Sequence, residues 1–178
     1  MPTTSVVVQH SARWLPACRT FSCGDADLDS FLSDDSLRLQ NEHVARTFLS
    51  VARTDGRILG YVTVLNDAVH LLTREKKKLG LASDDHPVVP ALKIARLGVA
   101  SEYARSGLGT ALVRHAYFSA QRSDASGGCR LLTVDAYRQA VSFYERLGFQ
   151  RNRSPEYRDR ESPSLRLDVF APELPDWI

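Results

Sequence analysis

The segment from residue 91 to residue 122 constrains the fold most, because it combines a strand, a glycine turn and a helix in direct succession. Residues 91–100 form an apolar run of the kind that a buried β-strand shows. Gly107-Leu108-Gly109 follows as a turn. The helical stripe in residues 110–122 then consists of Ala111, Leu112, His115, Ala116 and Phe118. A strand that leads into a helix through a short turn is typical of α/β and α+β proteins.

The glycine turn also predicts a binding site for an anion. The first N–H groups of a helix have no acceptor within the helix, and they point at whatever lies in front of it. The helix dipole favours negative charge there, and the missing side chains of Gly107 and Gly109 let a pyrophosphate approach the backbone. A simple tight turn is the alternative interpretation. The segment is neither a Walker A loop, because no Gly-Lys-Ser/Thr ends it, nor a complete GxGxxG motif.

The rest of the chain alternates helices and strands. An amphipathic helix is expected within residues 21–40, with Asp25 or Asp27 as its N-cap. Two β-rich runs around an Asp-Gly pair predict a hairpin of residues 48–53 and 57–65. The later elements are a strand at 130–136, a short helix at 139–147 that ends at Gly148 in the C′ position, and two final strands at 149–153 and 165–170.

This order of elements predicts an α/β or α+β fold with a mixed sheet. The 178 residues favour one domain that spans residues 1–178. Residues 66–90 interrupt the pattern, and we expect a partly helical insertion there. Its lysine-rich part, 74–78, is expected to form a solvated face, and the Asp-Asp-His-Pro segment at 84–87 is expected to be a loop.

Composition excludes several classes of protein. Hydrophobic residues make up 43% and charged residues 25% of the chain, which is ordinary for a globular protein and unlike a disordered or disulfide-rich one. Lys and Arg exceed Asp and Glu by only 23 to 21, so net charge alone indicates no nucleic-acid or membrane partner, although a local basic patch stays open.

Cysteine use and hydropathy indicate the cytoplasm. Cys18, Cys23 and Cys129 lack the paired spacing of a zinc site, which predicts reduced thiols. The chain shows neither a signal-peptide pattern nor an apolar run of about 20 residues, so we expect no membrane span. Five scattered histidines form no triad or metal set, and no metal cofactor is expected.

Two motifs resemble those of the GNAT superfamily of N-acetyltransferases. Leu97-Gly98-Val99 followed by Gly107-Leu108-Gly109 is similar to the family's acetyl-CoA-binding core, where a hydrophobic strand precedes an R/Q-x-x-G-x-G/A loop. Residues 140–149, AVSFYERLGF, resemble the family's A-x-x-F-Y-E-x-x-G-F segment. The resemblance covers residues 21–170. It departs from the pattern at Ala104, where the family has Arg or Gln, and at Tyr137, where many relatives have Asn.

The resemblance implies a fold and a reaction. The fold is a mixed, mostly antiparallel sheet with a splayed pair of parallel strands, flanked by helices. The reaction transfers an acetyl group from acetyl-CoA to a primary amine of a small molecule or peptide, and the amine attacks the thioester directly.

The same resemblance implies which residues bind the cofactor. The backbone of Leu97, Gly98 and Val99 would hold the pantetheine arm. The pyrophosphate would lie against the loop formed by Arg105, Ser106, Gly107, Leu108, Gly109 and Thr110. Tyr144 matches the family's general acid, which contacts the cofactor and protonates the departing thiolate.

The general base stays open between two carboxylates. An attacking amine must lose a proton to a carboxylate or to a water that a carboxylate holds. Asp67 follows the expected strand at 57–65, and Asp135 ends the expected strand at 130–136. A turn or capping role is the alternative for both residues. Asn66, Asp67 and Arg96 are expected to line the acceptor pocket.

Several further residues are similar to one branch of the superfamily, which includes toxins that acetylate aminoacyl-tRNA and their uncharacterised relatives. They are Phe21-Ser22-Cys23-Gly24, the LDSFL segment at 28–32, Gly60-Tyr61 and Arg96-Leu97. This alternative implies charged tRNA as the acceptor, a basic groove to bind it and an antitoxin partner. A non-catalytic CoA-sensing module is a third possibility, and homodimers are common in the superfamily.

Overall fold

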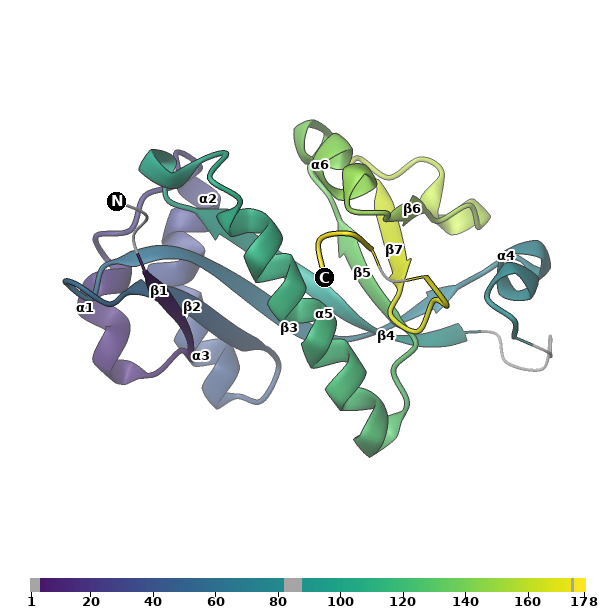
Figure 1. Ribbon diagram of the computed structural model, residues 1–178, viewed down its shortest axis with the longest axis horizontal. Coiled ribbons are helices and arrows are strands. Elements are labelled where there is room, and N and C mark those ends of the chain that lie inside the picture. The colour runs from purple at the N-terminus through teal and green to yellow at the C-terminus, as the bar shows by residue number, and fades with distance from the viewer. Residues whose placement is uncertain (1–3, 82–87, 174) are drawn as a thin grey trace. The chain divides into compact units, whose positions relative to one another are not determined.

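The computed structural model describes residues 4–81, 88–173 and 175–178. Within them, seven strands form a sheet in the order β1-β2-β3-β4-β5-β7-β6 (Figure 1). The strands are β1 (Ser5–Gln9), β2 (Arg46–Ala52), β3 (Ile58–His70), β4 (Val88–Val99), β5 (Leu131–Asp135), β6 (Gln150–Arg151) and β7 (Ser164–Asp168). Strands β4 and β5 are parallel, whereas β1–β2, β2–β3, β5–β7 and β6–β7 are antiparallel. The predicted mixed, mostly antiparallel sheet is confirmed.

Helices flank this sheet. The α-helices are α1 (Leu15–Cys18), α2 (Ala26–Ser30), α3 (Ser36–Asn41), α4 (Thr73–Lys78), α5 (Leu108–Gly127) and α6 (Val141–Arg146). A π-helical turn, Phe31–Asp35, joins α2 to α3. Single 3₁₀ turns occur at Ala12–Trp14, Ser101–Tyr103, Arg138–Ala140 and Pro155–Tyr157. None of the helices in the described part of the chain has the length and apolar character that a membrane span requires.

The chain divides into two compact units. The first unit consists of Met1–Leu65 and Ala95–His115, and the second consists of Asn66–Ile94 and Ala116–Ile178. In the first unit the β2–β3 hairpin turns at Gly56, whose φ of +75° is the left-handed conformation that glycine favours, as the Asp-Gly signal predicted. Asp25 caps α2, because its side chain accepts hydrogen bonds from the backbone N–H groups of Asp27 and Leu28.

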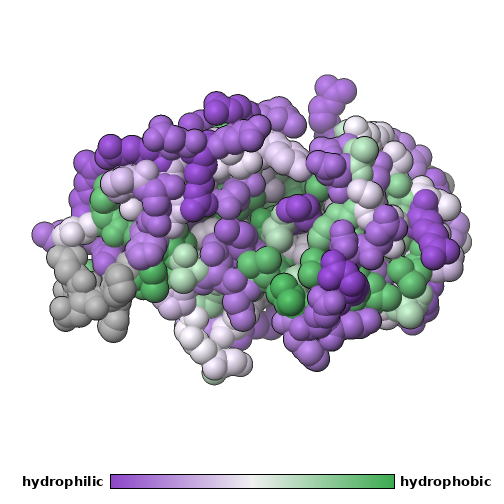
Figure 2. Space-filling view, turned by 180° about the vertical axis from the view of Figure 1, so that it is seen from behind, coloured by the Kyte–Doolittle hydropathy of each residue, from purple (hydrophilic) through white to green (hydrophobic). Residues whose placement is uncertain are grey.

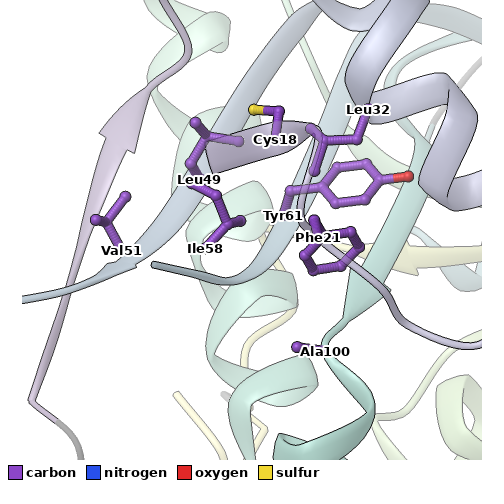
Figure 3. Close-up of a cluster of buried hydrophobic side chains, with 8 residues drawn as sticks. All are labelled: Cys18, Phe21, Leu32, Leu49, Val51, Ile58, Tyr61 and Ala100. Carbon is purple, nitrogen blue, oxygen red and sulfur yellow. The ribbon is translucent and has the colours of Figure 1, made fainter. Parts of the chain in front are cut away.

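Tyr61 lies in the core of the first unit (Figure 3). This core consists of Cys18, Phe21, Leu32, Leu49, Val51, Ile58, Tyr61 and Ala100. The Tyr61 phenol donates a hydrogen bond to the Leu28 carbonyl at 2.8 Å, and its ring meets Phe21 edge-on with the centroids 5.6 Å apart. A Cβ at Gly98 would lie 2.6 Å from Cε1 of Tyr61, so β4 approaches this ring only because residue 98 is glycine.

The second unit is built on the parallel strand pair. Ala91–Ile94 of β4 pairs with Leu131–Val134 of β5, and β5 in turn pairs with β7. The core here consists of Val69, Leu71, Val89, Ala91, Leu131 and Tyr157. Gly148 follows α6 with a φ of +84°, which confirms the predicted C′ glycine.

The structure corrects the prediction for residues 66–90. Strand β3 runs to His70, so Asn66 and Asp67 lie within the strand and not after it. Burial alternates along this part of the strand, with Val69 buried between exposed neighbours, so the polar residues that looked like a loop belong to a half-exposed strand. Helix α4 follows, and the expected loop at 84–87 lies outside the described residues.

Two further expectations were wrong or incomplete. Glu75 and Lys76 in the lysine-rich stretch are buried, at 3% and 6% exposure, whereas Lys77 and Lys78 are exposed as predicted. The sequence did not predict β1, which is a short strand that pairs with β2 alone in the sheet order. The three cysteines are free thiols, as expected.

Candidate active site

The loop that precedes α5 has the backbone geometry of an anion site. Helix α5 begins at Leu108, and its first helical hydrogen bond runs from Ala111 N–H to the Gly107 carbonyl at 3.1 Å. The N–H groups of Leu108, Gly109 and Thr110 therefore precede the first acceptor within the helix. Residues 104–107 are exposed, so a ligand in solution reaches this end of the helix.

Two residues of this loop adopt the left-handed conformation. Arg105 has a φ of +62° and Gly107 a φ of +88°, on either side of Ser106. Alternating backbone hand turns successive N–H groups toward one concave side, which is how such loops bind phosphate. A Cβ at Gly107 would meet no atom within 4 Å, so the glycine serves the backbone conformation and leaves open space beside it. The loop fits the pyrophosphate of acetyl-CoA.

The expected pantetheine-binding residues end β4 in the first unit. Gly98 is buried, and Leu97 and Val99 are half-buried. The strand is fixed here on both sides of the chain, because Ala100 N–H donates to the Leu59 carbonyl at 2.9 Å and a Cβ at Gly60 would lie 2.9 Å from the Gly98 carbonyl oxygen.

Arg96 is exposed and anchored at the surface of the first unit. Its guanidinium carbon lies 5.2 Å from the centre of the Phe31 ring, which is a cation–π distance. It also donates a hydrogen bond to the Ala95 carbonyl at 2.9 Å. Its remaining N–H donors are available to an anionic group.

The two carboxylates that the sequence singled out lie together in the second unit. Lys93 bridges them, because its Nζ lies 3.1 Å from Oδ2 of Asp135 and 3.5 Å from Oδ2 of Asp67. Thr133 donates a hydrogen bond to Asp67 Oδ2 at 2.7 Å, and Arg160 lies 3.6 Å from Asp135 Oδ2. Asn66 is exposed on the neighbouring position of β3.

Asp135 keeps one oxygen for another donor. Its Oδ1 is buried and accepts no hydrogen bond from the described residues. A buried carboxylate oxygen without a donor is costly unless a ligand or water supplies one. The sequence analysis missed Lys93, Thr133 and Arg160. Lys93 carried a signal, since it is a lone charge between apolar residues in the run at 88–94.

Tyr144 lies buried on α6 in the second unit, at 4% exposure. Its ring meets Phe143 and Phe149 edge-on, with centroid distances of 5.0 Å and 5.3 Å. No described residue shares a hydrogen bond with its phenol. Burial raises the pKa of this phenol above its usual value, because desolvation disfavours the phenolate. Tyr144 is therefore fully protonated at neutral pH and able to donate a proton.

A comparison with known families decides what these features belong to. The sequence model described as "Acetyltransferase (GNAT) domain" matches residues 45–151, which is more than half of the chain. The chain belongs to the GNAT acetyltransferase family. The prediction of an N-acetyltransferase that uses acetyl-CoA is confirmed, and the matched range contains the loop before α5 and all of α6.

Solved structures with the same fold include several GNAT proteins. A tyrosine-to-phenylalanine mutant of KacT matches with a TM-score of 0.79 and 22% identity, over 93% of this chain and 95% of that chain. AtaT complexed with acetyl-methionyl-tRNAfMet matches with a TM-score of 0.78 and 20% identity, over 93% and 95%. AtaTR bound with acetyl-CoA matches with a TM-score of 0.72 and 22% identity, over 93% of both chains. At these identities the likeness establishes the fold.

Proposed function

We propose that this GNAT acetyltransferase acetylates the α-amino group of the amino acid on a charged tRNA. The observation that carries the proposal is the match of 93% of the chain to AtaT in complex with an acetylated aminoacyl-tRNA. It favours the charged-tRNA alternative of the sequence analysis over a small-molecule or peptide amine. The function requires the cytoplasm, where charged tRNA occurs, and the proposal treats residues 1–178 as one GNAT domain.

A protein partner follows from the same likeness. A matched AtaT mutant is a toxin bound to the C-terminus of the antitoxin AtaR, and KacTA is bound to DNA in another matched structure. An antitoxin is the corresponding partner that we propose for this chain, and the homodimer that the superfamily makes common stays part of the proposal.

The proposed mechanism assigns each group one step. The N–H groups from Arg105 to Thr110 bind the pyrophosphate, and the β4 backbone at Leu97, Gly98 and Val99 holds the pantetheine arm. The amine of the acceptor loses its proton to Asp135, whose buried Oδ1 has no other donor among the described residues, or to Asp67 beside it. The amine then attacks the thioester carbonyl, and Tyr144 protonates the departing thiolate.

Acceptor mass spectrometry tests the function. The purified protein is incubated with acetyl-CoA and, separately, with charged tRNA, amino acids, polyamines and peptides. The expected product is N-acetyl-aminoacyl-tRNA, with release of free CoA thiol. Acetylation of a small amine or peptide and none of charged tRNA would overturn the proposal. Stabilisation by CoA without turnover on any acceptor would identify a CoA-sensing module instead.

Replacing Gly107 by valine is expected to abolish binding of acetyl-CoA while the protein stays folded. The left-handed φ of +88° is strained for valine, so the loop changes its path and its N–H groups no longer converge on the pyrophosphate. Calorimetric titration with CoA measures the loss. Gly128→Val is the matched control, because Gly128 has a φ of +72°, equally open space and no place in the loop. Equal CoA affinity of wild type and Gly107→Val would remove the pyrophosphate assignment.

Asp67→Asn and Arg96→Ala are expected to impair use of the acceptor and to leave the affinity for CoA unchanged. Asp67 lies in the carboxylate cluster with Asp135, and Arg96 offers free donors at the surface. Loss of either group should raise the KM for the acceptor or lower kcat. Steady-state kinetics with varied acceptor and CoA titration separate the two effects. A variant that weakens CoA binding with unchanged acceptor kinetics places its residue on the cofactor side.

A further inference from the structure

The second unit contains a cavity of about 890 Å³ that the proposed acetyl transfer does not use. Its lining comes from α4, from the segment around β6 and from β7. The lining residues are Arg74, Glu75, Lys78, Glu145, Phe149, Gln150, Arg151, Asn152, Arg153, Arg158 and Arg166. We refer to it as the basic cavity. Hydrophilic residues also dominate the face of the molecule shown in Figure 2.

Positive charge is concentrated in the basic cavity. Six of its lining residues are Arg or Lys and two are Glu, a net charge of +4, whereas the whole chain has a net charge of only +2. The excess positive charge of the protein therefore lies here. A concave basic surface of this kind raises the local concentration of anions and speeds their association.

Four of these cations are available to a ligand. Arg151 pairs with Glu145 at 2.9 Å, and Arg166 pairs with Glu75. The other four, Arg74, Lys78, Arg153 and Arg158, are exposed and make no ion pair within the described residues. Their charges are not neutralised by neighbouring carboxylates, so a bound anion would be their counter-ion.

The wall of the basic cavity is fixed by buried polar groups. Arg166 is 5% exposed and Glu75 is 3% exposed, and the ion pair between them is 2.9 Å long. Arg166 also donates to Asn152 Oδ1 at 2.8 Å and to the Arg151 carbonyl at 3.1 Å. This network ties α4, which carries Arg74 and Lys78, to the β6–β7 segment that carries Arg153. The cations are thus held around one concave surface before any ligand binds.

We propose that the basic cavity binds the phosphodiester backbone of an RNA double helix, which under the proposed function is the stem of the charged tRNA. Three of the four available cations are Arg, whose planar guanidinium matches phosphate oxygens in a bidentate way. The lining is polar apart from Phe149, and Phe149 is only 3% exposed. The cavity therefore offers no aromatic face on which an unpaired base could stack, and recognition through the backbone of a duplex remains.

Binding of a labelled RNA duplex, measured by fluorescence anisotropy over a range of salt concentrations, tests this site. The variant Arg74→Gln/Lys78→Gln/Arg153→Gln/Arg158→Gln is expected to bind the duplex about 10- to 100-fold more weakly, because four exposed charge contacts are lost. Its slope of log affinity against log salt should fall by about 3, since each phosphate contact contributes about 0.7–0.9. Unchanged affinity and slope would overturn the proposal.

A matched control separates this site from total charge. Arg153→Gln/Arg158→Gln and Arg19→Gln/Arg53→Gln remove the same charge, but Arg19 and Arg53 are exposed in the first unit, away from the basic cavity lining. Only the first pair should weaken duplex binding strongly. Equal losses in both pairs would reduce the effect to net charge, and preference for a single strand or for a polyglutamate peptide would also overturn the proposal.

Kinetics distinguish this inference from the proposed function on which it rests. The quadruple variant should show a raised KM for charged tRNA, while its kinetics on an aminoacylated 3′-terminal fragment without the stem stay at the wild-type values. Equal losses on both acceptors contradict a stem-binding role. If wild type acetylates neither acceptor but the variant still loses duplex binding, the proposed function fails and the RNA site stands.

Discussion

Arg166→Met is expected to lower the free energy of unfolding by about 3–5 kcal/mol, because it leaves Glu75 as a buried charge without its partner. Both residues are almost fully buried, at 5% and 3% exposure, and the ion pair between them is 2.9 Å long. Asn152 Oδ1 and the Arg151 carbonyl also lose their donor in this variant. Denaturation in urea, followed by fluorescence, measures the change.

The double variant Arg166→Met/Glu75→Leu shows whether the loss comes from the stranded charge. Apolar residues of similar volume commonly replace a buried ion pair at little cost, so the double variant should be clearly more stable than Arg166→Met alone. Arg38→Met is the surface control. Arg38 pairs with Asp35 and Glu42 but is 55% exposed, so its loss should cost about 0–1 kcal/mol. A cost for Arg166→Met as small as that for Arg38→Met would contradict the argument.

The sequence predicted those parts of the fold that depend on neighbouring residues. The Asp-Gly turn, the Asp25 cap and the glycine after α6 each require one local backbone conformation, and the structure has all three. The glycine turn before α5 was predicted on the same ground. Helix α5 extends beyond the expected residues 110–122 at both ends, since helix ends depend on hydrogen bonds that the apolar stripe does not specify.

The parts that the sequence did not predict depend on residues far apart in the chain. Lys93, Asp67 and Asp135 come from three different strands, and nothing near any of them indicates the other two. Glu75 reads as part of a solvated charge run because its partner, Arg166, lies on β7. The first turn of a buried charge network and an exposed helix therefore look alike in sequence, and only the pairing of the strands distinguishes them.

Tyr144→Phe is expected to lower the rate of acetyl transfer by about 10²-fold in single-turnover experiments. A positioned general acid contributes about 10²- to 10⁴-fold, and the variant removes only the phenol O–H. Because burial raises the pKa of Tyr144, the wild-type phenol stays protonated through neutral pH, and the rate should show no loss from its ionisation below about pH 10. The single-turnover format isolates the chemical step from product release.

Stability and CoA affinity provide the controls for this prediction. The phenylalanine ring keeps the edge-on contacts with Phe143 and Phe149, and no described residue loses a hydrogen bond, so unfolding and CoA binding should change little. Tyr137→Phe is the matched variant, since Tyr137 lies close by in sequence but is 39% exposed. A wild-type rate in Tyr144→Phe together with a slow Tyr137→Phe would transfer the acid role to Tyr137. Wild-type rates in both would leave proton delivery to water and make Tyr144 a packing residue of α6.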